Sequence, residues 1–267
     1  MTRIAVAGAA GRMGSRIVAL SKEYPVKLVG AFDRKGHKDI GRDAGLLAGA
    51  GELGIKLHDD IEAVIGDASV VIDFTAAGAT IRHLRVSASR GKAMVIGTTG
   101  LSKDDMAEIN TLAAKVPCVL ASNMSLGVNL LLKVIADVAK ALGDDYDVEI
   151  IEAHHRLKKD APSGTALRMA EAIAKALGRD LQETGVYARK GMIGERSKKE
   201  IGIQTVRAGD IVGEHTVLFG GLGERIEITH RASSRDTFAR GALKAALWLE
   251  GKAPGLYDMQ DVLGLKR

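Results

Sequence analysis

The chain has 267 residues, of which 46% are hydrophobic and 27% charged, and its formal net charge at neutral pH is +5. This length is enough for one large or two small hydrophobic cores. The positive charges are scattered, and aromatic residues make up only 3%, whereas a nucleic-acid-binding protein is expected to show a basic stripe with aromatic side chains for stacking. The composition therefore disfavours nucleic acid as a partner and agrees with anionic small-molecule ligands.

Cys118 is the only cysteine in the sequence, so neither an internal disulfide nor a cluster of cysteine metal ligands can form. No apolar run reaches the roughly 20 residues that a membrane-spanning helix needs. The first residues also lack the charged, apolar and small-residue regions of a signal peptide. We therefore expect a soluble, cytoplasmic protein with no membrane partner.

A glycine-rich segment follows the first predicted strand. Residues 3–7 form a short apolar run, then come Gly8, Gly11 and Gly14, and apolar residues at helical spacing continue through 17–21. In a dinucleotide-binding loop the first glycine allows a tight turn and the second lets the backbone approach a pyrophosphate, while the third lets the helix pack on the strand. The spacing GxxGxxG differs from the commoner GxGxxG, but its place between a strand and a helix favours a dinucleotide cofactor.

The second predicted strand, residues 26–32, ends at Asp33. An acidic residue about 20 positions past the glycine loop is expected to meet the ribose hydroxyls of the adenosine. Arg34 and Lys35 come directly after it and can instead pair with a 2′-phosphate. These residues therefore allow both NAD and NADP.

The rest of this half alternates buried strands with amphipathic helices. We predict strands at 70–74, 93–96 and 118–121, helices at 79–90 and 102–115, a short helix at 59–65, and a mobile loop at 36–54. This alternation predicts an α/β fold with a Rossmann-like, doubly wound parallel sheet, on which ligands lie beyond the carboxyl ends of the strands. Polar residues follow three of these strands, and we expect them to line the nicotinamide: Thr75, Gly97 to Thr99, and Ser122 to Asn123.

The pattern changes after Asn123. We predict a helix at 126–142, strands at 148–152, 201–207, 214–219 and 224–230, a mobile basic excursion at 189–200, a helix at 239–249, and a short helix at 257–263. Several strands after a run of parallel units indicate a second α+β domain with a mixed or antiparallel sheet. We expect the helix at 239–249 to return to the first domain. The predicted domains are 1–125 with 235–267, which binds the dinucleotide, and 126–234.

The segment 149–170 suits proton transfer to an acidic substrate. A strand pattern ends at two histidines, and a basic loop and a polar helix start follow, which together supply His154, His155, Lys158, Ser163, Gly164 and Thr165. Ser163 or Thr165 can cap the helix, and the free N–H groups at its start attract an anion. This combination predicts an acidic small molecule that is held and also protonated.

Three alternatives account for parts of the pattern. Another two-domain NAD(P)-dependent dehydrogenase of amino or hydroxy acids would share the nucleotide half, but it would have no need of paired histidines with Ser-Gly-Thr. A protein that senses NAD(P) without turnover is disfavoured because no DNA-reading helix or basic stripe is present. A metal hydrolase at His154 and His155 is disfavoured because neighbouring strand residues point to opposite faces, and we predict no metal site.

Several motifs together resemble the 4-hydroxy-tetrahydrodipicolinate reductase family, also called dihydrodipicolinate reductase. They are GAAGRMG at 8–14, GTTG at 97–100, SNMSLGVN at 122–129, EAHHRLKKDAPSGTA at 152–166, VRAGDIVGEHTV at 206–217 and ITHRASSRDTFARGALKAALWL at 228–249. The resemblance covers essentially the whole chain. It implies reduction by NADH or NADPH of a cyclic, imine-containing dicarboxylate, with loss of water, on the pathway to lysine and diaminopimelate.

The resemblance also implies roles for single residues. Proton transfer would fall to His154 and Lys158, and substrate binding to His155, Ser163, Gly164, Thr165 and Thr99. The pyrophosphate would lie on Gly8, Ala9, Ala10, Gly11, Arg12 and Met13, and the adenosine end on Asp33 and Arg34. The nicotinamide would lie against Gly97, Thr98, Thr99, Ala121, Ser122, Asn123 and Met124. Members of the family are homotetramers built through the sheet of the second domain, so 126–234 would serve both substrate binding and oligomerisation.

Overall fold

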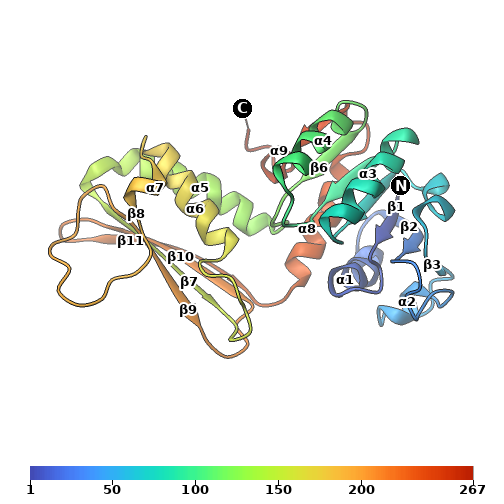
Figure 1. Cartoon of the computed structure of the whole chain (residues 1–267), viewed down its shortest axis with the longest axis horizontal. Coiled ribbons are helices and arrows are strands. Elements are labelled where there is room, and N and C mark those ends of the chain that lie inside the picture. Colours follow the sequence, from blue (N-terminus) through green and yellow to red (C-terminus); the bar gives the residue numbers. More distant parts are fainter. Residues whose placement is uncertain (267) are drawn as a thin grey trace. The chain divides into compact units, whose positions relative to one another are not determined.

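The structure is a computed structural model, and it describes residues 1–266. The chain forms two compact units (Figure 1). Unit 1 comprises residues 1–126 and the segment from 235 onwards, and unit 2 comprises residues 127–234. The sequence-based boundaries were 1–125 with 235–267 and 126–234; the roles given to the two units stay predictions.

Unit 1 is built on a parallel sheet. In the described part of the chain its strands are β1 (Thr2–Ala7), β2 (Val26–Phe32), β3 (Leu57–His58), β4 (Val70–Asp73), β5 (Ala93–Ile96), β6 (Pro117–Leu120) and β12 (Gly255–Tyr257). Their order across the sheet is β12-β6-β5-β4-β1-β2-β3, and every neighbouring pair is parallel. The predicted doubly wound parallel fold is thereby confirmed.

Helices cover both faces of this sheet. They are α1 (Arg12–Leu20), α2 (Ala44–Leu47), α3 (Ala77–Ser89), α4 (Lys103–Ala113), α8 (Asp236–Trp248) and α9 (Met259–Val262), with 3₁₀ turns η1 (Ser21–Glu23), η2 (Ile61–Ala63) and η3 (Ile65–Asp67). Because successive strand residues point to opposite faces, Ile4 and Val6 enter one hydrophobic core while Ala5 and Ala7 enter the other. Burial on both faces explains why these strands read as continuous apolar runs.

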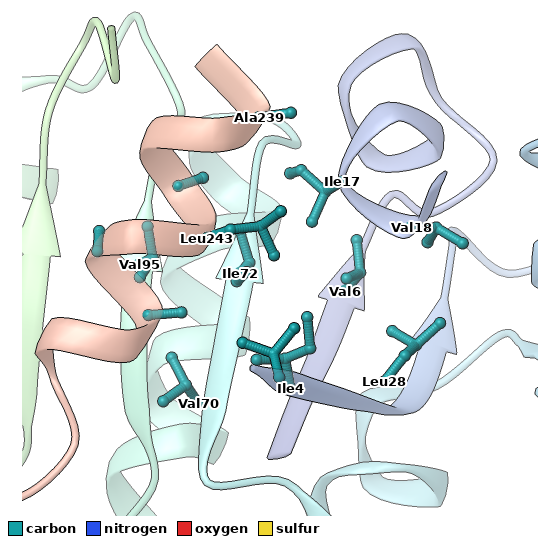
Figure 2. Close-up of a cluster of buried hydrophobic side chains, with 14 of the residues drawn as sticks. Ile4, Val6, Ile17, Val18, Leu28, Val70, Ile72, Val95, Ala239 and Leu243 are labelled. Atoms are coloured by element: carbon teal, nitrogen blue, oxygen red, sulfur yellow. The ribbon is translucent and has the colours of Figure 1, made fainter. Parts of the chain in front are cut away.

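Helix α8 returns to unit 1 from the far end of the sequence, as predicted. Its Ala239 and Leu243 are fully buried in the same core as Ile17 of α1 and Ile72 of β4 (Figure 2). Arg16 of α1 adds a two-pronged ion pair with Asp236 at the start of α8, with both N···O distances at 2.7 Å. Residues more than 200 positions apart therefore close one core.

Three local predictions in unit 1 were wrong or incomplete. The loop predicted at 36–54 contains the short helix α2, capped by Asp43, whose carboxylate also accepts N–H groups from Leu53 and Ile55. The helix predicted at 59–65 is two separate 3₁₀ turns, η2 and η3. The two edge strands were not predicted at all: β3 pairs with β2 at one edge of the sheet, and β12 pairs with β6 at the other.

Unit 2 combines a mixed sheet with helices, as predicted. Its elements are α5 (Leu126–Leu142), η4 (Gly143–Asp145), β7 (Asp147–His154), α6 (Gly164–Ala176), α7 (Leu181–Thr184), β8 (Gly185–Val186), β9 (Ile201–Arg207), β10 (Gly213–Gly220) and β11 (Arg225–Ala232). The strand order is β11-β10-β7-β9-β8. Strand β7 is parallel to β9 and antiparallel to β10, which places it at the centre of the sheet.

One face of this sheet is covered and the other is open. Apolar side chains of α5 and α6 pack on the inward residues of β7, β9 and β10. On the opposite face, Ile151 of β7 and Val206 of β9 are each more than a third exposed. No helix in the described chain is both long enough and apolar enough to cross a membrane.

The basic excursion at 189–200 has no helix or strand, as predicted, but it is tied to β7. Arg189 and Arg196 both pair with Glu149, at 2.7 and 3.1 Å. Arg196 also reaches Asp147 at 2.7 Å. The two arginines of this segment therefore anchor it to the central strand.

Candidate active site

The polar clusters of unit 1 lie along one edge of its sheet. The strand register pairs Ala7 with both Phe32 and Asp73, Asp73 with Ile96, and Ile96 with Leu120, so five strands end side by side. The chain moves from β1 to β2 on one side and later to β4 on the other, which makes the β1/β4 boundary a topological switch point. Ligands of open α/β sheets bind at such a point, beyond the carboxyl ends of the strands.

The glycine loop shapes this edge. Gly8 has a φ of +62°, and a Cβ there would lie 3.0 Å from the Thr75 methyl carbon. A Cβ on Gly14 would lie 2.1 Å from the Gly8 carbonyl oxygen, a distance that no packing can accommodate. The first glycine thus permits the turn, and the third permits helix α1 to approach it closely.

The start of helix α1 is open to an anion. Gly11 occupies the N-cap position, and no side chain in the described part of the chain caps the helix there. The N–H groups of the first turn, beginning with Arg12 and Met13, therefore remain for a ligand. Ala9, by contrast, is buried in the core, so it contributes backbone rather than side chain to the loop.

A cleft of about 580 Å³ opens beside this helix start. Its apolar walls include Phe32, Ile61, Phe74 and Val86. Its charged lining residues are Asp33, Asp59 and Asp60, and Arg34, Lys35 and Arg82. The Asp33 carboxylate accepts N–H groups from Ala10 at 3.2 Å and from Arg34 at 2.8 Å. An apolar slot with a fixed carboxylate and cations at its mouth fits the adenosine end of a dinucleotide.

A fully buried carboxylate, Asp73, organises the middle of the edge. It accepts hydrogen bonds from Thr75 Oγ1 at 2.6 Å and Thr80 Oγ1 at 3.2 Å, and it contacts His83 Nδ1 at 2.6 Å. Thr98 is also buried, with its hydroxyl 2.7 Å from that of Thr80. The Thr98 side chain therefore points inward, and within the predicted Gly97 to Thr99 cluster only the Thr99 side chain is exposed.

The segment after β6 also contains both buried and exposed side chains. Ala121 and Met124 are 5% and 1% exposed and belong to the core, so the Met124 side chain packs inside unit 1. A Cβ on Gly241 of α8 would lie 1.7 Å from the Met124 carbonyl oxygen, which shows how closely that helix covers this backbone. Ser122 is exposed and Asn123 half-buried, so these two retain surface for a ligand.

In unit 2 a second buried carboxylate, Glu152, binds the predicted catalytic histidine. Glu152 is fully buried, and its Oε2 lies 2.6 Å from His154 Nδ1. Arg207 of β9 grips both carboxylate oxygens, at 2.8 and 2.9 Å. The Ser163 N–H donates to Oε1 at 2.9 Å, so strand β7, strand β9 and the start of helix α6 meet at one group.

These contacts determine the protonation states of Glu152 and His154. Burial alone would raise the pKa of Glu152, but hydrogen bonds from Arg207, His154 and Ser163 hold that pKa below its ordinary value. Burial lowers the pKa of His154, against the opposing effect of Glu152, and the positive charges of Lys158 and Arg207 lower it further. At neutral pH, His154 is therefore a neutral imidazole. The hydrogen-bond network assigns its proton to Nδ1, facing Glu152, and leaves the lone pair on Nε2.

The helix start that follows is capped by Ser163, one of the two predicted caps. Its hydroxyl accepts the Ala166 N–H at 3.1 Å and lies 3.0 Å from Nε2 of His215. Burial lowers the pKa of His215 to about 4, so this imidazole is also neutral. Because both the N–H and the hydroxyl of Ser163 are used internally, the neighbouring Gly164, which is exposed, offers the open N–H of this helix start.

The remaining predicted residues lie on the loop between β7 and α6. Lys158 is half-buried and pairs with Asp160 at 2.7 Å. His155 is also half-buried, and its Nδ1 has no hydrogen-bond partner among residues 1–266. An imidazole, a cation and a helix start thus lie within about a dozen residues, and their roles in proton transfer and substrate binding stay predictions.

Glu152, Arg207 and His215 were not predicted as site residues. A signal for Glu152 existed, since it falls in phase with the buried Val148 and Ile150 on strand β7. A carboxylate on the buried face of a strand requires partners. Arg207 and His215 come from β9 and β10, and a single sequence gives no register for those strands.

Comparisons with known proteins agree over the whole chain. The family model described as dihydrodipicolinate reductase, N-terminus, matches residues 2–124, and the model described as dihydrodipicolinate reductase, C-terminus, matches residues 127–263. A 4-hydroxy-tetrahydrodipicolinate reductase of Geobacter sulfurreducens is 58% identical over 266 residues, covering 100% of both chains. Its counterpart from Syntrophobacter fumaroxidans is 58% identical over 267 residues, again covering 100% of both.

Solved structures show the same architecture. A dipicolinate-bound dihydrodipicolinate reductase from Paenisporosarcina sp. TG-14 superposes with a TM-score of 0.77, at 26% identity and with 98% of each chain covered. An amine dehydrogenase from Mycobacterium smegmatis gives a TM-score of 0.59 at 16% identity, with 96% of this chain and 94% of that chain covered. The second likeness concerns the fold alone.

Proposed function

We propose that this chain, which belongs to the dihydrodipicolinate reductase family, reduces 4-hydroxy-tetrahydrodipicolinate to tetrahydrodipicolinate with NADH or NADPH and releases water. This reaction would place it in lysine and diaminopimelate biosynthesis. Full-length relatives that carry this activity in their names support the proposal. The observation that carries it is the neutral His154, held against the buried Glu152 beside the positive charge of Lys158.

The substrate is a cyclic dicarboxylate, and unit 2 offers groups for its carboxylates. The exposed Gly164 stands at the start of helix α6, whose partial positive charge favours an anion. His155 adds a half-buried imidazole on the loop before it. The dipicolinate bound to the Paenisporosarcina relative is also a ring dicarboxylate, which supports the same class of ligand here, with Ser163 as the cap that holds the helix start in place and Thr165 next to it.

The chemistry needs one proton acceptor and one proton donor. The substrate loses its 4-hydroxyl together with a proton from the adjacent ring carbon, and a hydride and a proton then reduce the new double bond. Neutral His154 takes up the first proton at Nε2 and returns it to the same carbon, while the Lys158 ammonium protonates the departing hydroxyl as water. Lys158 regains a proton from solvent, so the sum is one hydride and one proton added and one water released.

Unit 1 holds the cofactor, which supplies the hydride. The pyrophosphate lies at the turn and helix start from Gly8 to Met13. Asp33 binds the adenosine ribose hydroxyls and Arg34 a 2′-phosphate, so the site accepts NADH and NADPH. Gly97 to Thr99 and Ala121 to Met124 lie at the same sheet edge. Because the side chains of Thr98 and Met124 are buried, the nicotinamide would contact backbone groups and the exposed neighbours of these two residues.

A homotetramer is part of the proposal. The open face of the unit 2 sheet carries the exposed apolar residues Ile151 and Val206, which a second copy of the chain would cover. Light scattering coupled to gel filtration tests this: four times the 28.2 kDa chain mass is expected, and a monomeric mass would refute it. The cytoplasmic location stays a prediction.

The direct test of function is a substrate panel. Oxidation of NADH and of NADPH is followed at the nicotinamide absorbance, with 4-hydroxy-tetrahydrodipicolinate formed in situ from pyruvate and aspartate semialdehyde by the condensing enzyme. We expect fast oxidation with this substrate and none with plain 2-oxo acids, with or without ammonia. Turnover of a 2-oxo acid, with no turnover of the cyclic substrate, would instead identify an ordinary amino- or hydroxy-acid dehydrogenase.

A further inference from the structure

Glu152 receives more hydrogen bonds than an ion pair between two strands requires. Besides Arg207 and the His154 ring, it accepts the Ser163 N–H and lies 3.4 Å from Thr205 Oγ1. All of these partners converge on a side chain with no exposed surface. Burying a carboxylate is costly unless it is paired and fully hydrogen-bonded, so this arrangement leaves the carboxylate little freedom to move.

An ion pair with only a structural role would connect β7 to β9 and make no contact with His154. Here, however, Oε2 is shared between Arg207 Nη1 and His154 Nδ1, at 2.8 and 2.6 Å. The His154 ring also packs edge-to-face on the His215 ring, with centroids 5.2 Å apart. The ring is therefore held at Nδ1 and along one face, while Nε2 lies toward Gly213, where an added Cβ would come within 3.1 Å of it.

We propose that Glu152 is a positioning residue for His154, with Arg207 fixing the carboxylate, so that the imidazole keeps its proton on Nδ1 and presents Nε2 to the substrate. This inference rests on the proposed role of His154 in proton transfer. It adds Glu152 and Arg207, neither of which touches the reacting atoms, to the residues on which the reaction depends.

The Glu152–Arg207 ion pair is also connected to Lys158, the other proposed proton-transfer group. Arg207 Nη2 donates to the Asp160 carbonyl oxygen at 2.7 Å, and the Asp160 carboxylate pairs with the Lys158 ammonium. Through the Ser163 N–H, Glu152 also fixes the start of helix α6. One buried ion pair thus sets the positions of the acceptor, the donor and the proposed carboxylate site.

The charges around His154 give the direction of the expected pH effect. Glu152 on β7 favours the protonated ring, whereas Lys158 on the loop and Arg207 on β9 disfavour it, and His215 on β10 is a neutral neighbour. Replacing Glu152 by glutamine removes the negative charge that raises the pKa of His154. That pKa should then fall further, and the amide N–H can donate to Nδ1, which forces the ring proton onto Nε2.

The test compares Glu152→Gln with Glu149→Gln. Glu149 is a matched control, because it lies on the same strand and is held by two arginines, Arg189 and Arg196, but its side chain does not contact His154. Nitrogen-15 NMR of labelled histidine reports the His154 tautomer, and kinetics report kcat against pH. We expect Glu152→Gln to lower kcat about 10²-fold or more, to move the acidic limb of the profile to lower pH, and to switch the tautomer. Glu149→Gln should leave all three unchanged.

A second variant and the NMR measurement ensure that the experiment can still refute the role of Glu152. If Glu152→Gln does not fold, Glu152→Asp keeps the charge but shortens its reach, and we expect a similar loss of kcat; an unchanged kcat would overturn the inference. It would also be overturned if Glu152→Gln kept the wild-type tautomer and pH profile. The NMR measurement needs no turnover, so a wild type inactive on the cyclic substrate would refute the proposed function while the tautomer still decided the role of Glu152.

Discussion

The backbone N–H of Ala10 donates a hydrogen bond to the Asp33 carboxylate over 3.2 Å, which ties the glycine loop to the end of strand β2. The other oxygen of that carboxylate accepts the Arg34 N–H at 2.8 Å. Held in this way, the acid faces the cleft of unit 1 at a fixed position, with the exposed Arg34 side chain beside it. We therefore expect Asp33 and Arg34 to recognise different features of the cofactor.

Replacing Asp33 by alanine should weaken the binding of NADH more than the binding of NADPH. A hydrogen bond to a charged group contributes roughly 1.5–3 kcal/mol, so we expect the dissociation constant of NADH to rise about ten-fold or more, with a smaller rise for NADPH. Arg34→Ala is the matched variant and should weaken NADPH while leaving NADH unchanged. Fluorescence titration with each cofactor measures both. Equal effects of each variant on the two cofactors would refute this division of roles.

Gly14→Ala should destabilise unit 1, because its Cβ would lie 2.1 Å from the Gly8 carbonyl oxygen. Overpacking of this kind costs about 1–3 kcal/mol, and the displaced loop should also bind either cofactor less tightly. Gly78 on helix α3 is the control, since a Cβ there meets nothing within 4 Å. Gly78→Ala should leave stability unchanged or raise it by up to about 1 kcal/mol. Denaturant unfolding compares the two, and similar stabilities would contradict the close packing at Gly14.

Ser163→Ala should reduce stability and weaken substrate binding together. Loss of an N-cap serine costs about 1 kcal/mol, and here the helix start is also part of the proposed carboxylate site. Ser102 caps helix α4 of unit 1 and accepts the Asp105 N–H at 3.1 Å. Ser102→Ala should cost a similar free energy of unfolding with no change in the substrate KM. An unchanged KM in Ser163→Ala would remove this helix start from the substrate site.

His215 should make the protein less stable as the pH falls from 6.5 to 4. Its pKa is lowered from 6.5 to about 4 by burial and by His154, His230 and Lys158, with Glu152 opposing them. In this window the unfolded chain takes up a proton that the folded chain refuses, so the stabilisation present above pH 6.5 is lost by pH 4. The loss is about 3 kcal/mol, at 1.36 kcal/mol per pKa unit.

His215→Gln isolates this contribution. Glutamine retains a polar group that can reach Ser163 but does not titrate, so the variant should lose less stability than wild type between pH 6.5 and 4. Urea unfolding across that range measures the difference. Parallel curves for the two proteins would show that His215 titrates normally in the folded state.

Much of unit 1 could be predicted because its strands are buried on both faces. Val70 to Asp73 and Ala93 to Ile96 read as continuous apolar runs for that reason. Strand β12 escaped prediction because three half-buried residues give no periodicity. Helix α2 escaped because its single turn depends on Asp43 gathering N–H groups from residues up to twelve positions away.

The candidate site shows the same limit. His154, Lys158 and Ser163 lie on one continuous segment, so sequence order alone brought them together. Arg207 and His215, which surround Glu152, come from strands 50 to 60 positions later. Which residues face Glu152 depends on register, since Glu152 pairs with Thr205 on β9 and with His215 on β10. Register follows from tertiary packing, and one sequence does not contain it.

The central claim is that His154 and Lys158 carry the proton transfers of the reduction. Its most direct measurement is the kcat of His154→Gln and Lys158→Met with the cyclic substrate, alongside the dissociation constant of NADH. Both variants should lose about 10²- to 10⁴-fold in kcat with NADH binding unchanged, while the exposed neighbour control, Lys159→Met, keeps wild-type turnover. A kcat within two-fold (about 0.4 kcal/mol) of wild type in both variants would contradict the claim and move the proton transfers to other groups.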